Sequence, residues 1–223
     1  MDHGFDRGRY LDVLYPFQDS VLGAISSVDT GFYLTGGTAA SRGYLNHRFS
    51  DDLDLFVNDD PRFEFWADRI VQALAAKPEW VVTVTLKETR FVRLVVASEV
   101  DLKLELVSDV PSHTGEIRDH PRLGRLDSAE NILANKLTAL SAREEPKDLA
   151  DVWGFCSRLG LPIPRALGHA HSKAAGLFPA DLARVLLSAQ RSDWELVRWI
   201  EAPEPNQYVE TLHRLGEELL LLK

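Results

Sequence analysis

Acidic side chains recur inside an apolar stretch of the sequence, DDLDLF, where Asp52 and Asp54 alternate with Leu53 and Leu55. In a β-strand, residues two apart face the same side and lie about 6.6–7 Å apart along the backbone. Two carboxylates held that close raise each other's pKa unless they share a cation. Magnesium prefers carboxylate oxygens and completes its shell with water and substrate phosphates. The pair therefore predicts a site for metal-assisted phosphoryl chemistry, in which two acids could reach both ions of a two-metal centre.

Two glycines stand upstream of these acids, at the end of the apolar stretch FYLTGG. Gly36 and Gly37 lie where a predicted strand turns into a predicted helix, and glycine lets the backbone approach a ligand closely there. Free N–H groups at such a turn bind phosphate oxygens. Thr38 could cap the helix or donate its hydroxyl to the phosphates. The alternative is an ordinary tight turn.

The elements that must position these residues follow from hydrophobic periodicity. Alternating or β-branched runs predict strands at 32–37, 52–57, 80–88, 90–98 and 100–107, and helical spacing predicts helices at 10–29, 38–45 and 62–77. In VDLKLELV, alternation puts Asp101, Lys103 and Glu105 on one face and the leucines on the other. The N-terminal half is thus expected to be a sheet with helices packed against it.

Beyond about Gly124 the sequence shows no convincing strand and a succession of helical patterns. They cover residues 128–143, 147–160, 179–190, 192–200 and 207–222, and the segment LGLPIPRALG, with Pro162 and Pro164, separates the second from the rest. We therefore expect an α+β protein with two domains, an α/β core at 1–124 and a C-terminal helical bundle at 125–223.

Composition narrows the class of protein. The 223 residues are 45% hydrophobic and 26% charged, which is ordinary for a globular chain. No apolar run approaches the roughly 18–20 residues of a spanning helix, and the polar start MDHGFDRGRY is unlike a signal peptide. One cysteine, Cys156, suits a reducing compartment, so a cytoplasmic location without membrane attachment is expected. The net charge of −9 argues against coating nucleic acid and leaves only a local basic patch for RNA, with Lys87, Arg90, Arg93 and Arg118 as candidates.

GGTAA followed by HRFSDDLDLF resembles the nucleotidyltransferase signature of the polymerase β superfamily, in the form found in AbiEii and MenT toxins of type IV toxin–antitoxin systems. The glycine pair, the run from Arg48 to Asp54 and two later motifs occur in the family's order. The resemblance spans about Phe32 to Trp153 and implies a polymerase β-like mixed sheet with flanking helices.

The resemblance also implies roles for these residues. Asp52 and Asp54 would bind two Mg²⁺ ions, and the third metal ligand would be Glu105 or Asp101, between which the sequence does not choose. The triphosphate of the substrate NTP would be bound by a larger set: Gly36, Gly37, Thr38, Arg48, Ser50, Lys103, Lys136 and Arg143.

The second later motif is NILANKLTALSAREEPKDLADVW. Helical spacing puts Lys136 and Arg143, seven residues apart, along one apolar edge, and puts Asp148 and Asp151 on a face that borders the core. By resemblance, Lys136 would bind triphosphate, and Asp148 or Asp151 would support or activate the site. The family usually has arginine where Lys147 stands, which weakens a bidentate role at that position.

The function that the resemblance implies is transfer of a nucleoside monophosphate from an NTP to an acceptor hydroxyl, at the 3′ end of tRNA, by a toxin opposed by an antitoxin protein. Two alternatives stay open. One is an enzyme that modifies a small molecule such as an aminoglycoside. The other is a non-catalytic module for nucleotide binding or protein interaction that kept the fold.

Overall fold

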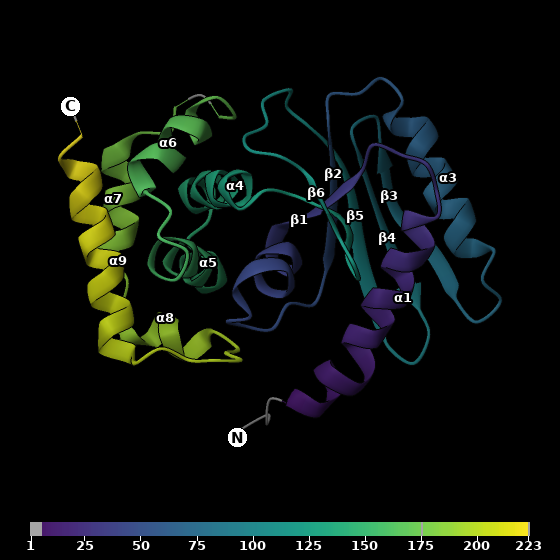
Figure 1. Cartoon of the computed structure of the whole chain (residues 1–223), viewed down its shortest axis with the longest axis horizontal. Coiled ribbons are helices and arrows are strands. Elements are labelled where there is room, and N and C mark those ends of the chain that lie inside the picture. Colours follow the sequence, from purple (N-terminus) through teal and green to yellow (C-terminus); the bar gives the residue numbers. More distant parts are fainter. Residues whose placement is uncertain (1–5, 175, 223) are drawn as a thin grey trace. The chain divides into compact units, whose positions relative to one another are not determined.

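The computed structural model describes residues 6–174 and 176–222 of the chain. These residues form two compact units, each assembled from several stretches of the sequence (Figure 1). The first unit takes the chain up to Thr38, Ser50–Pro111 and Ile117–Asp127, and the second takes Ala39–Phe49, Ser112–Glu116 and the chain from Ser128 onward. The sequence predicted one boundary near residue 124. Segments 39–49 and 112–116 precede that residue in the sequence but belong to the helical unit.

In the described residues of the first unit, the centre is a mixed seven-stranded sheet with the strand order β3-β4-β5-β2-β1-β7-β6. The central strand β2 (Leu53–Asn58) pairs in parallel with β5 (Asp101–Asp109) and antiparallel with β1 (Tyr33–Thr35). The remaining strands are β3 (Val81–Glu88), β4 (Phe91–Ala97), β6 (Arg118–His120) and β7 (Gly124–Leu126). The expected sheet is therefore confirmed, with acid-bearing strands at its middle.

One face of this sheet is apolar. Buried residues alternate along β2, β4 and β5, at Leu53, Leu55, Val57, Val92, Leu94, Val96, Leu102, Leu104 and Leu106. Helices α1 (Tyr15–Ser26) and α3 (Phe63–Ala75) cover this face (Figure 1) and bury their own apolar stripes against it. Burial of each Val or Leu contributes about 1.5–3 kcal/mol. Alternation then places the acids of β2 and β5 on the opposite face.

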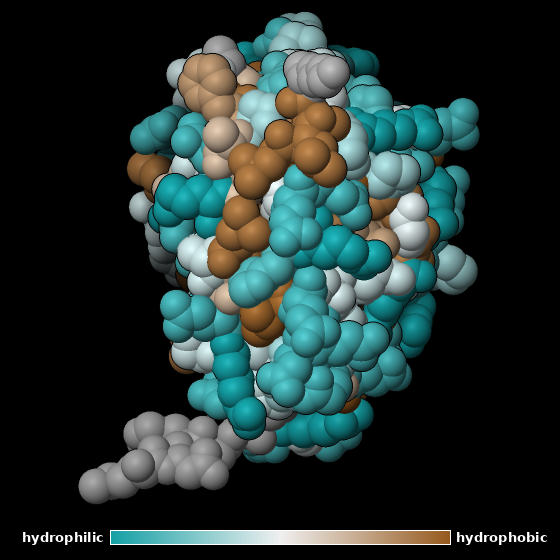
Figure 2. Space-filling view, turned by 90° about the vertical axis from the view of Figure 1, so that its left-hand side faces the viewer, coloured by the Kyte–Doolittle hydropathy of each residue, from teal (hydrophilic) through white to brown (hydrophobic). Residues whose placement is uncertain are grey.

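The second unit is helical over its described residues. It begins with a π-helical segment at Ala39–Leu45, and its α-helices are α4 (Ala129–Ala142), α5 (Pro146–Ser157), α6 (Ile163–His171), α7 (Pro179–Leu187), α8 (Arg191–Leu196) and α9 (Pro205–Leu220). Trp153, Trp199 and Tyr208 pack against one another in this unit, with ring centroids 5.5–5.9 Å apart, and Trp199 meets each of the other two rings edge to face. Figure 2 looks onto the side of this unit that carries α9, where apolar side chains lie among hydrophilic ones.

Three elements differ from the sequence expectations. Helix α6 forms where Pro162 and Pro164 were expected to mark a separator, because Pro162 is its N-cap and Pro164 lies in its first turn, where the missing N–H costs nothing. The short strands β6 and β7 were not expected, and β7 begins at Gly124, where strand content was expected to end. No helix in the described ranges is both long and apolar enough to span a membrane.

Candidate active site

The acids on the polar face of the sheet come together through strand register. Strands β2 and β5 run parallel, and Asp54 stands directly opposite Glu105. Neighbouring strands lie about 4.7–4.9 Å apart, so the two carboxylates leave the sheet side by side. Asp52 lies just before β2, two residues from Asp54. Asp101 is exposed at the start of β5, where it stands opposite Ala97 of β4. The structure therefore brings Glu105, and not Asp101, beside Asp54.

Lys103 supplies the positive charge that these acids require. Its Nζ atom lies 2.8 Å from Oδ2 of Asp52 and 3.5 Å from Oε1 of Glu105. Burial alone would lower the pKa of the Lys103 ammonium, but Asp52, Glu105 and Asp54 outweigh that effect and raise it. A second cation, Arg93 of β4, places its Nε 2.9 Å from the same oxygen of Glu105. The ammonium of Lys103 is thus paired with two carboxylates and also experiences the charge of a third, that of Asp54.

Gly36 is required where it stands. Its φ is +66°, in the left-handed region, and a Cβ added there would lie 2.1 Å from Oδ2 of Asp54. Any side chain at this position would collide with the carboxylate. The next turn continues into Thr38, whose Oγ1 donates to the carbonyl oxygen of Asp52 at 2.5 Å and lies 3.0 Å from Oγ of Ser50. The glycine turn and the acidic strand are therefore one packed arrangement.

The donor set fits a magnesium site in its chemistry. Asp52, Asp54 and Glu105 offer only carboxylate oxygens, which magnesium prefers. These carboxylates lie around Lys103, whose positive charge offsets their negative charges, as a bound divalent ion would also do. Among the described residues, no three His, Cys, Asp or Glu side chains are assembled closely enough to form a ready-made metal site. Two of the three expected ligands, Asp52 and Glu105, are thus paired with Lys103 or Arg93 in this structure.

A second cluster of charges lies inside the helical unit. Lys136 of α4 is only 7% exposed, and its Nζ lies 2.7 Å from both Asp148 and Asp151 of α5. Arg48 donates two parallel hydrogen bonds of 2.7 Å to Asp151, from Nε to Oδ1 and from NH2 to Oδ2. Asp148 also accepts a bond of 3.1 Å from Nε of Arg143, which is half exposed. Four of these five predicted residues are therefore buried in one ion-pair network.

The network sets the ionisation of its members. Burial would raise the pKa of Asp151, but Arg48 and Lys136 outweigh it and hold that pKa well below its usual range. Burial likewise would lower the pKa of Lys136, yet Asp151 and Asp148 raise it. His47 lies at the edge of the network, with Nε2 3.0 Å from Oδ1 of Asp151. Here burial dominates and lowers the pKa of His47, so the imidazole is neutral near pH 7.

The predicted site residues therefore fall into two sets. The first unit holds Gly36, Gly37, Thr38, Ser50, Asp52, Asp54, Asp101, Lys103 and Glu105, and the second holds Arg48, Lys136, Arg143, Asp148 and Asp151. The nucleotide-binding role of the second set stays a prediction. His47 and Arg93 were missed by sequence reasoning as members of these clusters. Their positions in the sequence could have indicated them. His47 directly precedes Arg48 of the motif, and Arg93 alternates with apolar residues on a predicted strand.

Three of the cations predicted to contact RNA are engaged within the first unit. Lys87 pairs with Asp68 at 2.6 Å, Arg90 donates to Asp59, and Arg93 donates to Glu105. An RNA phosphate would have to displace a carboxylate at each of them. Each of the three cations thus already has a carboxylate partner, and their predicted role in RNA binding stays a prediction.

Comparisons with known proteins bear on the family and the fold of the chain. Residues 21–198 match the family model described as "Nucleotidyl transferase AbiEii toxin, Type IV TA system". Among solved structures, the nucleotidyltransferase toxin MenT4 from Mycobacterium tuberculosis H37Rv is similar with a TM-score of 0.69 and 18% identity, over 95% of this chain and 84% of that chain. A candidate nucleotidyltransferase from H. pylori is similar with a TM-score of 0.63 and 19% identity, over 92% and 93%. A comparison with curated protein sequences gave no match.

Proposed function

The chain belongs to the AbiEii family of nucleotidyltransferase toxins of type IV toxin–antitoxin systems, and from that premise we propose that it transfers a nucleoside monophosphate from an NTP to a hydroxyl at the 3′ end of tRNA. The observation that carries the proposal is the cluster formed by Asp52, Asp54 and Glu105 around Lys103. Two acids paired with one cation, and a third beside them next to a glycine turn, supply the kinds of group that in-line displacement at a phosphate uses.

In the proposed reaction, the acceptor hydroxyl oxygen attacks the α-phosphorus, the bond to the β-phosphate breaks, and pyrophosphate leaves. Asp52, Asp54 and Glu105 would hold the two magnesium ions that the family resemblance implies, and the ions would supply positive charge at the attacking and leaving oxygens. Glu105 would orient the acceptor hydroxyl and take its proton. Lys103 and the backbone N–H groups after Gly36 would bind the phosphates.

The family also supports a partner for this protein. A type IV toxin–antitoxin system contains an antitoxin, and we propose that one opposes this chain. Transfer to a small acceptor is the second candidate function. The net charge of −9 favours it, because a polyanionic acceptor such as tRNA is repelled by an acidic protein unless local cations are released for it.

A labelling experiment separates the two candidates. The protein is incubated with each α-labelled NTP, Mg²⁺ and total tRNA, and then with the same nucleotides and small hydroxyl acceptors in the absence of RNA. Labelled tRNA supports the proposal, and a labelled small molecule supports the second candidate. No transfer to any acceptor would contradict both.

Variants of β2 and β5 test the site itself. Asp54→Asn and Glu105→Gln are each expected to lower kcat at least about 100-fold, because each removes a charge that acts on the transferring phosphate. Asp101→Asn removes a carboxylate from the same strand as Glu105 but from a position that does not adjoin Asp54. It is expected to leave kcat close to the wild-type value. If Asp101→Asn lowered kcat strongly and Glu105→Gln did not, the inference from strand register that Glu105 is the active acid would be wrong.

A further inference from the structure

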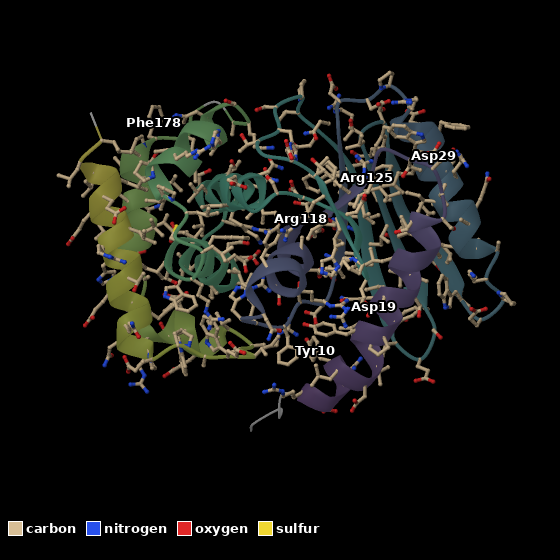
Figure 3. All side chains as sticks on the ribbon, viewed as in Figure 1. Tyr10, Asp19, Asp29, Arg118, Arg125 and Phe178 are labelled. Carbon is tan, nitrogen blue, oxygen red and sulfur yellow. The ribbon has the colours of Figure 1, made fainter. Side chains whose placement is uncertain are left out.

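The N-terminal helix presents three polar side chains on one face. Its first segment, Arg9–Leu14, is π-helical, and the N–H of Tyr15 donates to the carbonyl oxygen of Tyr10. A bond that spans five residues stacks residues five apart, so the rings of Tyr10 and Tyr15 meet edge to face with centroids 5.9 Å apart. Gln18 follows one turn later on the same face of α1. Tyr10 is labelled in Figure 3, at the N-terminal end of this helix.

This face holds the loop that leads into β2. The amide Nε2 of Gln18 donates to the carbonyl oxygens of Ser50, at 3.2 Å, and of Asp51, at 2.9 Å. The hydroxyl of Tyr15 accepts from the N–H of Ser50 at 3.3 Å. The hydroxyl of Tyr10 donates to the carboxylate of Asp51. Three side chains of one helix therefore fix the two residues that directly precede Asp52.

The loop is held by these side chains in place of strand pairing. Residues 50–52 lie outside the described strands, so no sheet ladder sets their backbone. A buried carbonyl that loses its donor must find another or move. The carbonyl oxygen of Asp52 accepts from Thr38, and those of Ser50 and Asp51 accept from Gln18. The three carbonyls in a row are thus satisfied by two side chains.

Gln18 is also unusual for its place in the helix. It is 0% exposed and belongs to a stripe that otherwise contains Leu14, Val21, Leu22 and Ile25. A leucine at this position would pack in the same stripe without the cost of burying an amide. Retaining the amide is explained by the two carbonyls that it binds. The family model matches residues 21–198, so Gln18 and both tyrosines precede the matched region.

We propose that Gln18 is a positioning residue for the metal-binding carboxylates: it fixes the backbone before β2 so that Asp52 projects beside Asp54. This inference rests on the proposed nucleotidyl transfer with magnesium. Gln18 touches neither substrate nor metal in this proposal and acts through the peptide groups of Ser50 and Asp51. Tyr15 and Tyr10 support the same loop from the preceding turns. The N-terminal helix is therefore part of the catalytic scaffold as well as a cover for the sheet.

The variant Gln18→Met tests the role, because methionine keeps the length of the side chain and removes both donated bonds. Its matched control is Ser20→Ala on the same helix, where the exposed hydroxyl bonds only to the carbonyl of Pro16 within the helix. We expect the Mg²⁺ concentration for half-maximal transfer to rise about tenfold in Gln18→Met, as the loss of hydrogen bonds to buried groups implies. The KM for the NTP at saturating Mg²⁺ is expected to stay at its wild-type value. Ser20→Ala is expected to leave both quantities unchanged.

Two further measurements do not depend on activity. Hydrogen exchange at the amides of residues 50–52 is expected to be about tenfold faster in Gln18→Met, with exchange in α9 unchanged. Binding of Mn²⁺, measured by electron paramagnetic resonance on the protein without nucleotide, is expected to weaken by a similar factor. A merely structural role would lower the melting temperature without moving the Mn²⁺ affinity of the folded fraction.

The outcomes can be told apart. Wild-type Mg²⁺ dependence, Mn²⁺ affinity and loop exchange in folded Gln18→Met would overturn the inference. Absence of transfer by the wild-type protein would instead refute the proposed function, and the exchange measurement would still decide whether Gln18 holds the loop. If Gln18→Met does not fold, Tyr15→Phe replaces it, since this change removes one hydroxyl, keeps the ring, and is expected to shift the same quantities in the same direction.

Discussion

Replacement of Gly36 by alanine gives the sharpest test of how the glycine turn and the acidic strand depend on each other. The added Cβ would lie 2.1 Å from Oδ2 and 2.9 Å from Cγ of Asp54, whereas ordinary contact begins at 3.4 Å. Either the carboxylate or the turn must therefore move by about 1.3 Å. A displacement of about 1 Å at reacting groups can lower the rate about 100-fold, so kcat of Gly36→Ala is expected to fall at least that far.

The same substitution also carries a backbone cost that is unrelated to Asp54. A left-handed conformation costs an L-residue about 1–2 kcal/mol. Gly160 has the same φ of +66°, but nothing lies within 4 Å of the Cβ that alanine would add there. Gly160→Ala is therefore the matched control, and it is expected to lose about 1–2 kcal/mol of unfolding free energy in urea while its kcat stays at the wild-type level.

The assay for both variants is steady-state transfer of labelled nucleotide, together with urea unfolding to show that each protein is folded under the assay conditions. If the folded Gly36→Ala protein transfers nucleotide at the wild-type rate, Asp54 does not need the position that the structure gives it. The reasoning that links Gly36 to the site would then be refuted. Equal losses of activity in the two variants would attribute the effect to backbone strain alone.

Two predictions concern the buried network of the helical unit. Asp151→Ala is expected to lower the unfolding free energy measured in urea by about 3–5 kcal/mol, because it leaves Arg48 and Lys136 buried with too little negative charge. The control Glu195→Ala, at an exposed ion pair, is expected to change the unfolding free energy by less than about 1 kcal/mol. Equal effects of the two variants would contradict the stabilising role of the buried network. His47 has a pKa below its ordinary value of 6.5 when folded, so below pH 6.5 the unfolded chain binds a proton that the folded chain does not. Stability should therefore fall as the pH drops from 6.5 toward the folded pKa, with a slope that approaches about 1.4 kcal/mol per pH unit; His47→Gln should flatten this part of the urea-derived profile, and an unchanged slope would exclude His47 as its source.

The sequence by itself determined which residue types could do chemistry and on which face of a strand their side chains lie. Alternation of polar and apolar residues follows from the two-residue period of a strand, so DLDLF and DLKLELV predicted which side of the sheet would carry Asp54, Lys103 and Glu105. Gly36 was identified for the same local reason, since a turn with close approach favours glycine. These inferences need only neighbouring residues, and the strands that they predicted are confirmed.

Only the tertiary structure decided which distant residues meet. That Glu105, and not Asp101, stands beside Asp54 depends on the register between β2 and β5, which no local pattern specifies. Gln18 meets the carbonyl of Ser50 across 32 residues of sequence, and Lys136 meets Asp151 on the next helix. A periodicity argument gives the face on which a side chain lies but not its partner. The partner is set by how elements pack, because hydrogen bonds and ion pairs between buried groups form only where folding brings both groups out of water together.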